Sequence, residues 1–256
     1  MLKKRIAAAI VVKNNRAVQS FGYRNYLPLG SVTTIIENLD RWSVDEIIVL
    51  DIDRSRNKIG PNLSLLKKVS SIPISTSLTY AGGITTVQDG LDVVDSGAER
   101  VIVDNLFLNN HKEIKSLSEA IGSQALIVSM PIKIIGNIPY HFDYIKNDVL
   151  EIDLEKLGNM KKFISEVMLI DVASEGVEGL FNSSLVELFS DIDLRLICYG
   201  GVGVSDKGSM LLNNEQVNAI AYGNILNYGE LAFQKIKKSL KKSKKKLRRS
   251  IYRDLI

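Results

Sequence analysis

Carboxylates end two similar apolar runs of this chain, where they could transfer protons. Asp51 follows the run 47–50, and Asp171 follows the run 167–170 about 120 residues later. Two carboxylates can act as general acid and general base when their surroundings hold one protonated and the other ionised. Acids at such positions are also common structural groups, so each is a weak catalytic candidate. The candidates are Asp51, Asp53, Asp171, Glu175 and Lys13.

Glycine pairs follow two further apolar runs and could hold phosphate. Gly82-Gly83 and Gly200-Gly201 again lie about half a chain apart, and about 20 residues beyond them come Asp104-Asn105 and Gly223-Asn224. Glycine lets backbone N–H groups approach an oxyanion closely. One such pair alone indicates only a tight turn, but the repetition favours two phosphate sites. The predicted ligand-binding residues are Gly82, Gly83, Asp104, Asn105, Gly176, Gly200, Gly201, Gly223 and Asn224.

The elements that must position these residues are short apolar runs, each followed by a helix-like segment. Such runs are typical of strands buried on both faces of a parallel sheet. Because the acid-ended run, the glycine turn and a third run occur twice, the chain is predicted to consist of two half-barrel repeats. Its 256 residues fit a single α/β (β/α)8 TIM barrel. We assign 1–234 to the barrel and 235–256 to a basic C-terminal helix or tail.

Charge is distributed unevenly along the chain. The formal net charge is +4, but eleven of the 33 basic residues lie between 235 and 253, so the barrel body is acidic. A basic tail could bind nucleic acid or anionic lipid. Few aromatic residues are interleaved with it, however, so a solvated helix is the plainer interpretation and we assign no nucleic-acid or membrane partner.

Composition sets further bounds on the class of protein. The single cysteine, Cys198, excludes an internal disulfide framework and suits a reducing compartment. No apolar run is long enough to span a bilayer, and 6–12 is predicted to be the first strand rather than a signal peptide, so we expect a cytoplasmic protein. His111 and His141 are expected at the surface. No metal site or cofactor is predicted.

Almost the whole chain, from Met1 to about Leu240, resembles HisF, the cyclase subunit of imidazole glycerol phosphate synthase. The resemblance rests on segments in the family's order and spacing: 1–6, 45–52, 82–84, 122–124 and 200–203. It implies a barrel that binds an elongated bisphosphate ribonucleotide across two phosphate sites. It also implies a glutaminase, docked at the opposite face, that supplies ammonia.

Four residues of alternating sign stand at or just before the starts of predicted strands: Arg5, Glu46, Arg100 and Glu166. At the amino-terminal mouth of the barrel their charges could compensate one another despite burial. On physical grounds alone they could equally form a stabilising plug. The resemblance implies instead a salt-bridge gate over an ammonia channel, with Arg100 where lysine is usual. It also implies that Glu99 and Gln124 contact the glutaminase.

The catalytic side of the resemblance is incomplete. The family's cyclisation uses two aspartates, at the ends of the first and fifth strands, and the matching positions here hold Val11 and Pro131. A positioned acid or base contributes about a hundred- to ten-thousand-fold in rate, so ordinary cyclase activity is not expected. Asp104 replaces an asparagine and Gln19 a lysine of the family, and Ser174 replaces a basic residue. These changes predict a different substrate, or one without phosphate at the first site.

Three functions therefore stay open. The first is a HisF-like subunit that pairs with a class I, HisH-like glutaminase and channels ammonia for amidination of a bacterial surface-sugar precursor. This function resembles that of HisF-like relatives that lack both catalytic aspartates. It would involve a phosphorylated or nucleotide-sugar ligand and a third, ATP-dependent amidotransferase protein. The second is a genuine cyclase subunit of histidine biosynthesis. The third is a non-catalytic scaffold or activator of the glutaminase.

Overall fold

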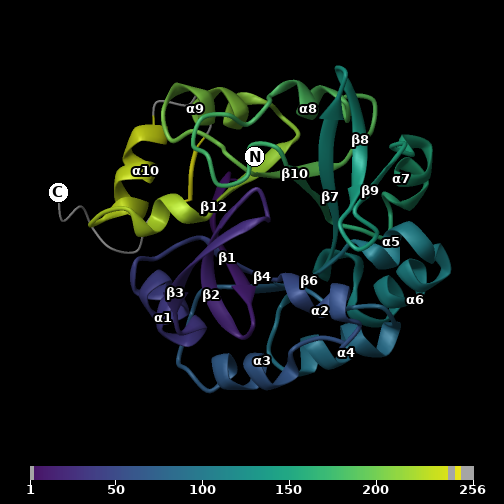
Figure 1. Cartoon of the computed structure of the whole chain (residues 1–256), viewed down its shortest axis with the longest axis horizontal. Coiled ribbons are helices and arrows are strands. Elements are labelled where there is room, and N and C mark those ends of the chain that lie inside the picture. Colours follow the sequence, from purple (N-terminus) through teal and green to yellow (C-terminus); the bar gives the residue numbers. More distant parts are fainter. Residues whose placement is uncertain (1–2, 242–245, 249–256) are drawn as a thin grey trace.

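The computed structural model describes residues 3–241 and 246–248, and its strands close into a barrel (Figure 1). Each strand pairs in parallel with the next, and β12 pairs with β1. The TIM-barrel prediction is thereby confirmed. The eight strands are β1 (Arg5–Lys13), β4 (Glu46–Asp51), β5 (Leu78–Ala81), β6 (Arg100–Val103), β7 (Leu126–Ile135), β10 (Glu166–Asp171), β11 (Arg195–Tyr199) and β12 (Val217–Tyr222).

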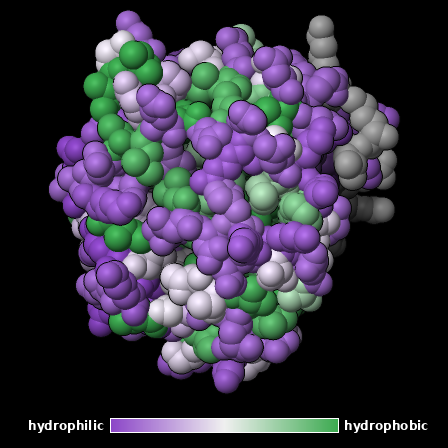
Figure 2. Space-filling view, turned by 90° about the vertical axis from the view of Figure 1, so that its right-hand side faces the viewer, coloured by the Kyte–Doolittle hydropathy of each residue, from purple (hydrophilic) through white to green (hydrophobic). Residues whose placement is uncertain are grey.

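Helices surround this barrel, as Figure 1 shows. They are α1 (Val32–Arg41), α2 (Ile52–Asn57), α3 (Leu63–Ser70), α4 (Val87–Asp95), α5 (Asn105–Asn109), α6 (His111–Ile121), α7 (Leu154–Met160), α8 (Ser184–Glu187), α9 (Asp206–Asn213) and α10 (Ala232–Leu240). Two 3-10 turns, η1 (Ser123–Ala125) and η2 (Asn224–Asn227), complete the connections. On the face drawn in Figure 2, hydrophobic residues form separate patches among hydrophilic ones. No helix in the described ranges is long and apolar enough to cross a bilayer.

Two apolar clusters result from the alternation of side chains along each strand. On β1, Ile6, Ala8 and Ile10 belong to the outer core between strands and helices. Ala7 and Ala9 belong to a separate cluster inside the barrel. Because successive side chains of a strand point to opposite faces, both faces of the sheet are buried and the run is apolar throughout.

A β-hairpin is added after the first and after the fifth barrel strand. β1 continues antiparallel into β2 (Arg16–Phe21) and β3 (Asn25–Gly30). β7 continues into β8 (Ile138–Asp143) and β9 (Asp148–Leu150). The two hairpins occupy matching places in the two halves of the chain, and both extend from the carboxyl ends of their strands.

The final helix packs against the barrel. α10 begins at Ala232, just before the boundary expected at 234, and buries Phe233 and Leu240. Lys237 Nζ lies 2.7 Å from Asp45 Oδ1, and both side chains are buried. In the tail, Arg248 N–H donates to the carbonyl oxygen of residue 4 over 3.1 Å. The remaining tail residues, 242–245 and 249–256, lie outside the described ranges.

Candidate functional site

A closed ring of ion pairs lies at the amino-terminal end of the barrel. Its four members are each the first residue of a strand: Arg5, Glu46, Arg100 and Glu166. Arg5 contacts Glu46 at 2.9 Å and Glu166 at 2.6 Å. Arg100 contacts the same two carboxylates at 3.2 and 2.6 Å. Each cation therefore bridges both acids, and the ring has no net charge.

Neutral donors complete the hydrogen bonds of the ring. The Thr79 hydroxyl donates to Glu46 over 2.6 Å, and the Asn218 amide donates to Glu166 over 2.7 Å. Burial alone would raise the pKa of Glu166, but the two arginines outweigh it and hold that pKa below its usual value. The ring is therefore satisfied by charge and by hydrogen bonds although it is almost completely buried.

Beyond the ring, the barrel interior is apolar. The inner cluster includes Ile48, Ile102, Ile127, Met168 and Ile197, with alanines on the adjoining strands β1 and β12. An ion would lose its hydration there without compensation, whereas the desolvation cost of a small neutral molecule is much lower. The interior therefore separates the charged ring from the opposite end of the barrel.

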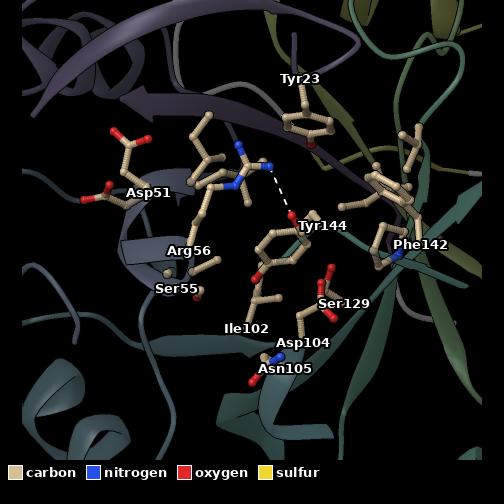
Figure 3. A pocket seen from close by; sticks show the side chains of 18 of the residues that line it. Tyr23, Asp51, Ser55, Arg56, Ile102, Asp104, Asn105, Ser129, Phe142 and Tyr144 are labelled. Carbon is tan, nitrogen blue, oxygen red and sulfur yellow. Dashed lines mark hydrogen bonds between the residues drawn. The ribbon is translucent and has the colours of Figure 1, made fainter. Parts of the chain in front are cut away.

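A cavity of about 390 Å³ opens at the carboxyl-terminal end of the barrel. Its wall comes from β4, β6 and β7, from the turns that follow them, and from both hairpins. Figure 3 shows Tyr144 near its centre, with Asp51 and Asp104 on different sides of that ring. Arg56 reaches in from α2 and donates through Nη2 to the backbone oxygen of Tyr144 over 3.0 Å. A volume of this size suits a small-molecule ligand.

Of the candidate acids, Asp51 lines the cavity in a form suited to proton transfer. Its side chain is buried, and burial raises its pKa to about 6, although the Asn62 amide opposes the shift through a 3.0 Å hydrogen bond. Asp53 also lines the cavity, but it bonds Lys13 at 3.2 Å and the backbone N–H of Asn14 at 2.6 Å. A carboxyl group that titrates near neutrality can either give or accept a proton.

Asp171 and Glu175 lie beside the cavity, where they bind neighbouring segments. Asp171 Oδ2 accepts from the Ser174 hydroxyl at 2.8 Å and from the backbone N–H of Asn182 at 2.9 Å. Glu175 accepts from the Ser20 hydroxyl at 3.0 Å and from the Tyr23 N–H at 3.1 Å. Both acids are buried, and burial raises the pKa of Glu175. Their oxygens hold loops in place rather than face the cavity.

The glycine pairs lie in equivalent tight packing sites of the two halves. A Cβ at Gly82 would collide with the carbonyl oxygen of Asp51, and one at Gly200 with that of Asp171. Both glycines also have positive φ, 134° and 97°. A Cβ at Gly83 or at Gly201 would likewise collide with backbone atoms of a neighbouring loop. The repeated glycines thus let neighbouring strand ends approach one another.

The predicted phosphate-binding residues divide between open and covered positions. Gly82, Asp104 and Asn105 line the cavity. In the other half, the β2–β3 hairpin covers the strand ends. The Asn224 side chain bonds the backbone of Ser20 at 2.7 and 3.2 Å, and a Cβ at Gly176 would collide with the same segment. The remaining predicted residues, Gly83, Gly200, Gly201 and Gly223, are not part of the cavity lining.

The surface position expected for His141 is wrong. Its residue surface is only 2% exposed, and its Nε2 lies 3.3 Å from Asp104 Oδ1. His111, by contrast, is half-buried and packs edge-on against Phe107. The error at His141 has a physical cause, because β8 buries its polar side chains His141 and Asp143 and leaves Ile138 exposed. Alternation of apolar residues therefore indicates the wrong face of this strand.

The two positions that lack the family's aspartates and the two expected glutaminase contacts lie on opposite faces of the barrel. Val11 and Pro131 are buried at the carboxyl-terminal side, where neither side chain can transfer a proton. Glu99 and Gln124 are exposed beside the ion-pair ring. The Gln124 backbone oxygen accepts from Arg100 Nε over 3.3 Å.

Several cavity residues were not anticipated from the sequence. Arg56, Lys133 and Tyr144 all line it, together with Tyr23 and Phe142. Four of these five come from the hairpins or the strand that leads into one. Their only signal in the sequence is an aromatic and basic composition near the ends of strands one and five, and this does not by itself predict a shared cavity.

Comparison with known proteins agrees with this architecture. The family model described as "Histidine biosynthesis protein" matches residues 5–232. The chain belongs to this family. It is 30% identical to the "Putative imidazole glycerol phosphate synthase subunit hisF2" of Vibrio vulnificus, over 98% of this chain and 93% of that protein. It is 26% identical to the HisF subunit of Syntrophobacter fumaroxidans, over 94% and 96% of the two chains, and 24% identical to that of Bacillus cereus, over 94% and 97%.

These matches make the chain a HisF-like protein over nearly its whole length. The barrel, the ion-pair ring and the cavity all lie within the matched range.

Proposed function

We propose that this HisF-like chain is the ammonia-receiving subunit of a glutamine-dependent enzyme. A class I glutaminase docks at the amino-terminal mouth, and ammonia passes through the barrel to a small molecule in the cavity. The relatives are named as synthase subunits, which supports action within a complex. The observation that carries the proposal is the closed ring of Arg5, Glu46, Arg100 and Glu166, which stands before an apolar interior that leads toward a cavity.

The two parts of this route select for neutral ammonia. Ammonium would lose its hydration in the apolar interior, whereas ammonia pays a much smaller desolvation cost. The ring blocks the amino-terminal end while all four ion pairs are made. Because Arg5 and Arg100 each bridge both acids, displacement of one arginine still leaves each carboxylate with a cation. One arginine can thus move aside during passage without leaving either acid unpaired.

The nitrogen acceptor is proposed to differ from that of the histidine-pathway cyclase. Val11 and Pro131 cannot supply the acid and base that the cyclase reaction needs. We assign the chain to amidination of a bacterial surface-sugar precursor, with a third, ATP-dependent amidotransferase protein activating the acceptor. The retained ring beside the lost acids supports a subunit that handles ammonia and does not cyclise a ribonucleotide.

The first test uses the family's ribonucleotide with excess ammonium salt at alkaline pH, where free ammonia bypasses any glutaminase. We expect no turnover, and we expect a HisH-like glutaminase to bind the purified chain. Turnover of the ribonucleotide would restore the cyclase function. Glutaminase binding without nitrogen transfer to any acceptor would instead favour the scaffold.

Docking is tested by charge reversal on the proposed face. Glu99→Arg should weaken glutaminase binding, whereas Asp148→Arg, exposed on β9 at the carboxyl-terminal side, should leave it unchanged. Equal affinity of the two variants would argue against the amino-terminal face as the docking site.

Passage through the ring is tested by coupling. Arg5→Met should separate glutamine hydrolysis from nitrogen transfer, so that ammonia escapes to solvent. Lys115→Met removes a cation from an exposed pair with Glu119 and serves as the matched control. Unaltered coupling in the Arg5 variant would reduce the ring to a structural plug.

A further inference from the structure

A carboxylate in the wall of the cavity contacts a buried imidazole that lies behind it. Asp104 directly follows β6 and lines the cavity with 11% of its side chain exposed. His141 approaches from β8, and its Nε2 lies 3.3 Å from Asp104 Oδ1. The two residues come from different halves of the barrel, and the chemistry of this wall depends on how they share protons.

The surroundings of His141 fix the number of protons in the pair. Its Nδ1 lies 2.9 Å from Met130 Sδ, and a thioether accepts but does not donate. Nδ1 therefore carries a hydrogen, and a single further proton lies between Nε2 and Asp104 Oδ1. The pair is either imidazolium with carboxylate or neutral imidazole with carboxylic acid. In both states Asp104 Oδ2 is a hydrogen-bond acceptor.

Asp104 Oδ2 has no protein donor among the described residues, since His141 is the hydrogen-bond partner of this side chain. An acceptor in a cavity wall is satisfied by a donor on the ligand. Phosphate at neutral pH offers chiefly acceptor oxygens and brings negative charge. The Asp104–His141 pair has no net charge, but the nearby carboxylate of Asp143 contributes negative potential at this wall. The end of the cavity beside Gly82 and Asn105 therefore disfavours phosphate.

Of the four cations that line the cavity, Lys13 is paired with Asp53, and the other three lie at its rim. Arg24 and Arg56 are exposed and Lys133 is half-buried, and they come from a hairpin turn, α2 and β7. None of the three is within ion-pair distance of a carboxylate in the described part of the chain. Lys133 Nζ instead lies 5.6 Å from the centre of the Phe142 ring. Unpaired cations at the rim favour an anionic group there.

We propose that the cavity binds its ligand in one orientation, with a hydroxyl or nitrogen donor on Asp104 Oδ2 and an anionic group against Arg24, Arg56 and Lys133. Between the two ends the flat face of Tyr144 suits a sugar ring (Figure 3). The ligand class is a hydroxylated or amino sugar that carries phosphate or carboxylate at one end. This inference rests on the proposed function only in taking the cavity as the ligand site.

Titration calorimetry with inorganic phosphate tests the polarity of the cavity. Arg56→Gln should weaken phosphate binding about fivefold, because it removes a rim cation. Asp104→Asn should tighten it about tenfold, because an acceptor that faces the cavity can become an amide donor. Asp95→Asn makes the same substitution at an exposed carboxylate on α4, outside the cavity lining, and should alter affinity less than about threefold.

Equal phosphate affinity in the Asp104 and Asp95 variants would overturn the proposal, as would weaker binding in the Asp104 variant. Circular dichroism establishes that each variant is folded, and Asp104→Ser replaces Asp104→Asn if the latter is not.

The donor half is tested with glucosamine, whose ammonium group is a cationic donor, by saturation-transfer NMR. The unaltered chain should bind it, and Asp104→Asn should weaken binding about fivefold. No transfer to glucosamine in the unaltered chain, or equal binding in the variant, would contradict the assignment. Neither experiment contains a glutaminase, so their failure leaves the ammonia-receiving function standing. Failure of glutaminase binding, conversely, leaves the orientation of the ligand untouched.

Discussion

Removal of one arginine from the ion-pair ring should destabilise the fold in a pH-dependent way. In Arg5→Met, Glu46 and Glu166 would share Arg100 alone, although Thr79 and Asn218 would still donate to them. Breaking a buried ion pair costs about 3–5 kcal/mol. Because each acid keeps one cation and one neutral donor, we expect a cost near or somewhat below the lower end of that range, about 2–4 kcal/mol at pH 7.5.

The pH dependence follows from the sign of the pKa shift. In the intact ring the pKa of Glu166 is lowered, so the stability it contributes is fully present above the ordinary glutamate pKa and is lost only at more acidic pH. Without Arg5, burial dominates and the pKa of this carboxyl rises. The variant can then relieve its excess negative charge by binding a proton. Its deficit relative to the unaltered chain should be smaller at pH 5.5 than at pH 7.5.

Urea unfolding of both proteins at these two pH values measures the deficit. Lys115→Met is the control, because its partner Glu119 is exposed and such pairs contribute less than about 1 kcal/mol. A deficit below about 1 kcal/mol at pH 7.5, or an equal deficit at both pH values, would refute the account of a tightly coupled buried ring.

Three further outcomes follow from contacts of the cavity and its loops. Glu175→Gln should speed hydrogen exchange of the backbone amides in the β2–β3 hairpin, measured by mass spectrometry. The substitution replaces the carboxylate that accepts hydrogen bonds from the Tyr23 N–H and the Ser20 hydroxyl with a weaker, neutral acceptor. Unchanged exchange rates in the hairpin would contradict this. Asp51→Asn should gain stability relative to the unaltered chain as pH rises through about 6 in urea titrations, since a raised carboxyl pKa costs stability once the group ionises. Gly82→Ala should cost more than about 3 kcal/mol in the same assay, and Gly136→Ala, in an open turn, only about 1 kcal/mol.

The fold could be predicted because its signals are local and repeated. Each barrel strand is a short apolar run, and the acid-ended runs at 47–51 and 167–171 lie at equivalent places in the barrel. The positions of Arg5 and Glu46 follow directly, because each begins such a run. Whether four side chains close into one ring depends on the stagger between strands, which composition does not specify.

The cavity could be predicted only in part. Asp51 and Gly82 stand at barrel strand ends, so their place in it follows from the fold. Tyr144 and His141 lie on a hairpin in which Ile138 is exposed and the polar His141 and Asp143 are buried, so the usual pattern points to the wrong face. The path of such an insertion is set by tertiary contacts that the local sequence does not encode.

The two hairpins explain how a repeated barrel acquires an asymmetric site. The β2–β3 hairpin is bonded to Glu175 and Asn224, so it lies over the strand ends of the second half. The β8–β9 hairpin instead brings Tyr144 and His141 beside the end of β6, in the first half. A ligand with two identical phosphate ends would suit equivalent halves. With one half covered and the other presenting the acceptor Asp104, the site is better matched to a ligand whose two ends differ, as an anionic sugar's do.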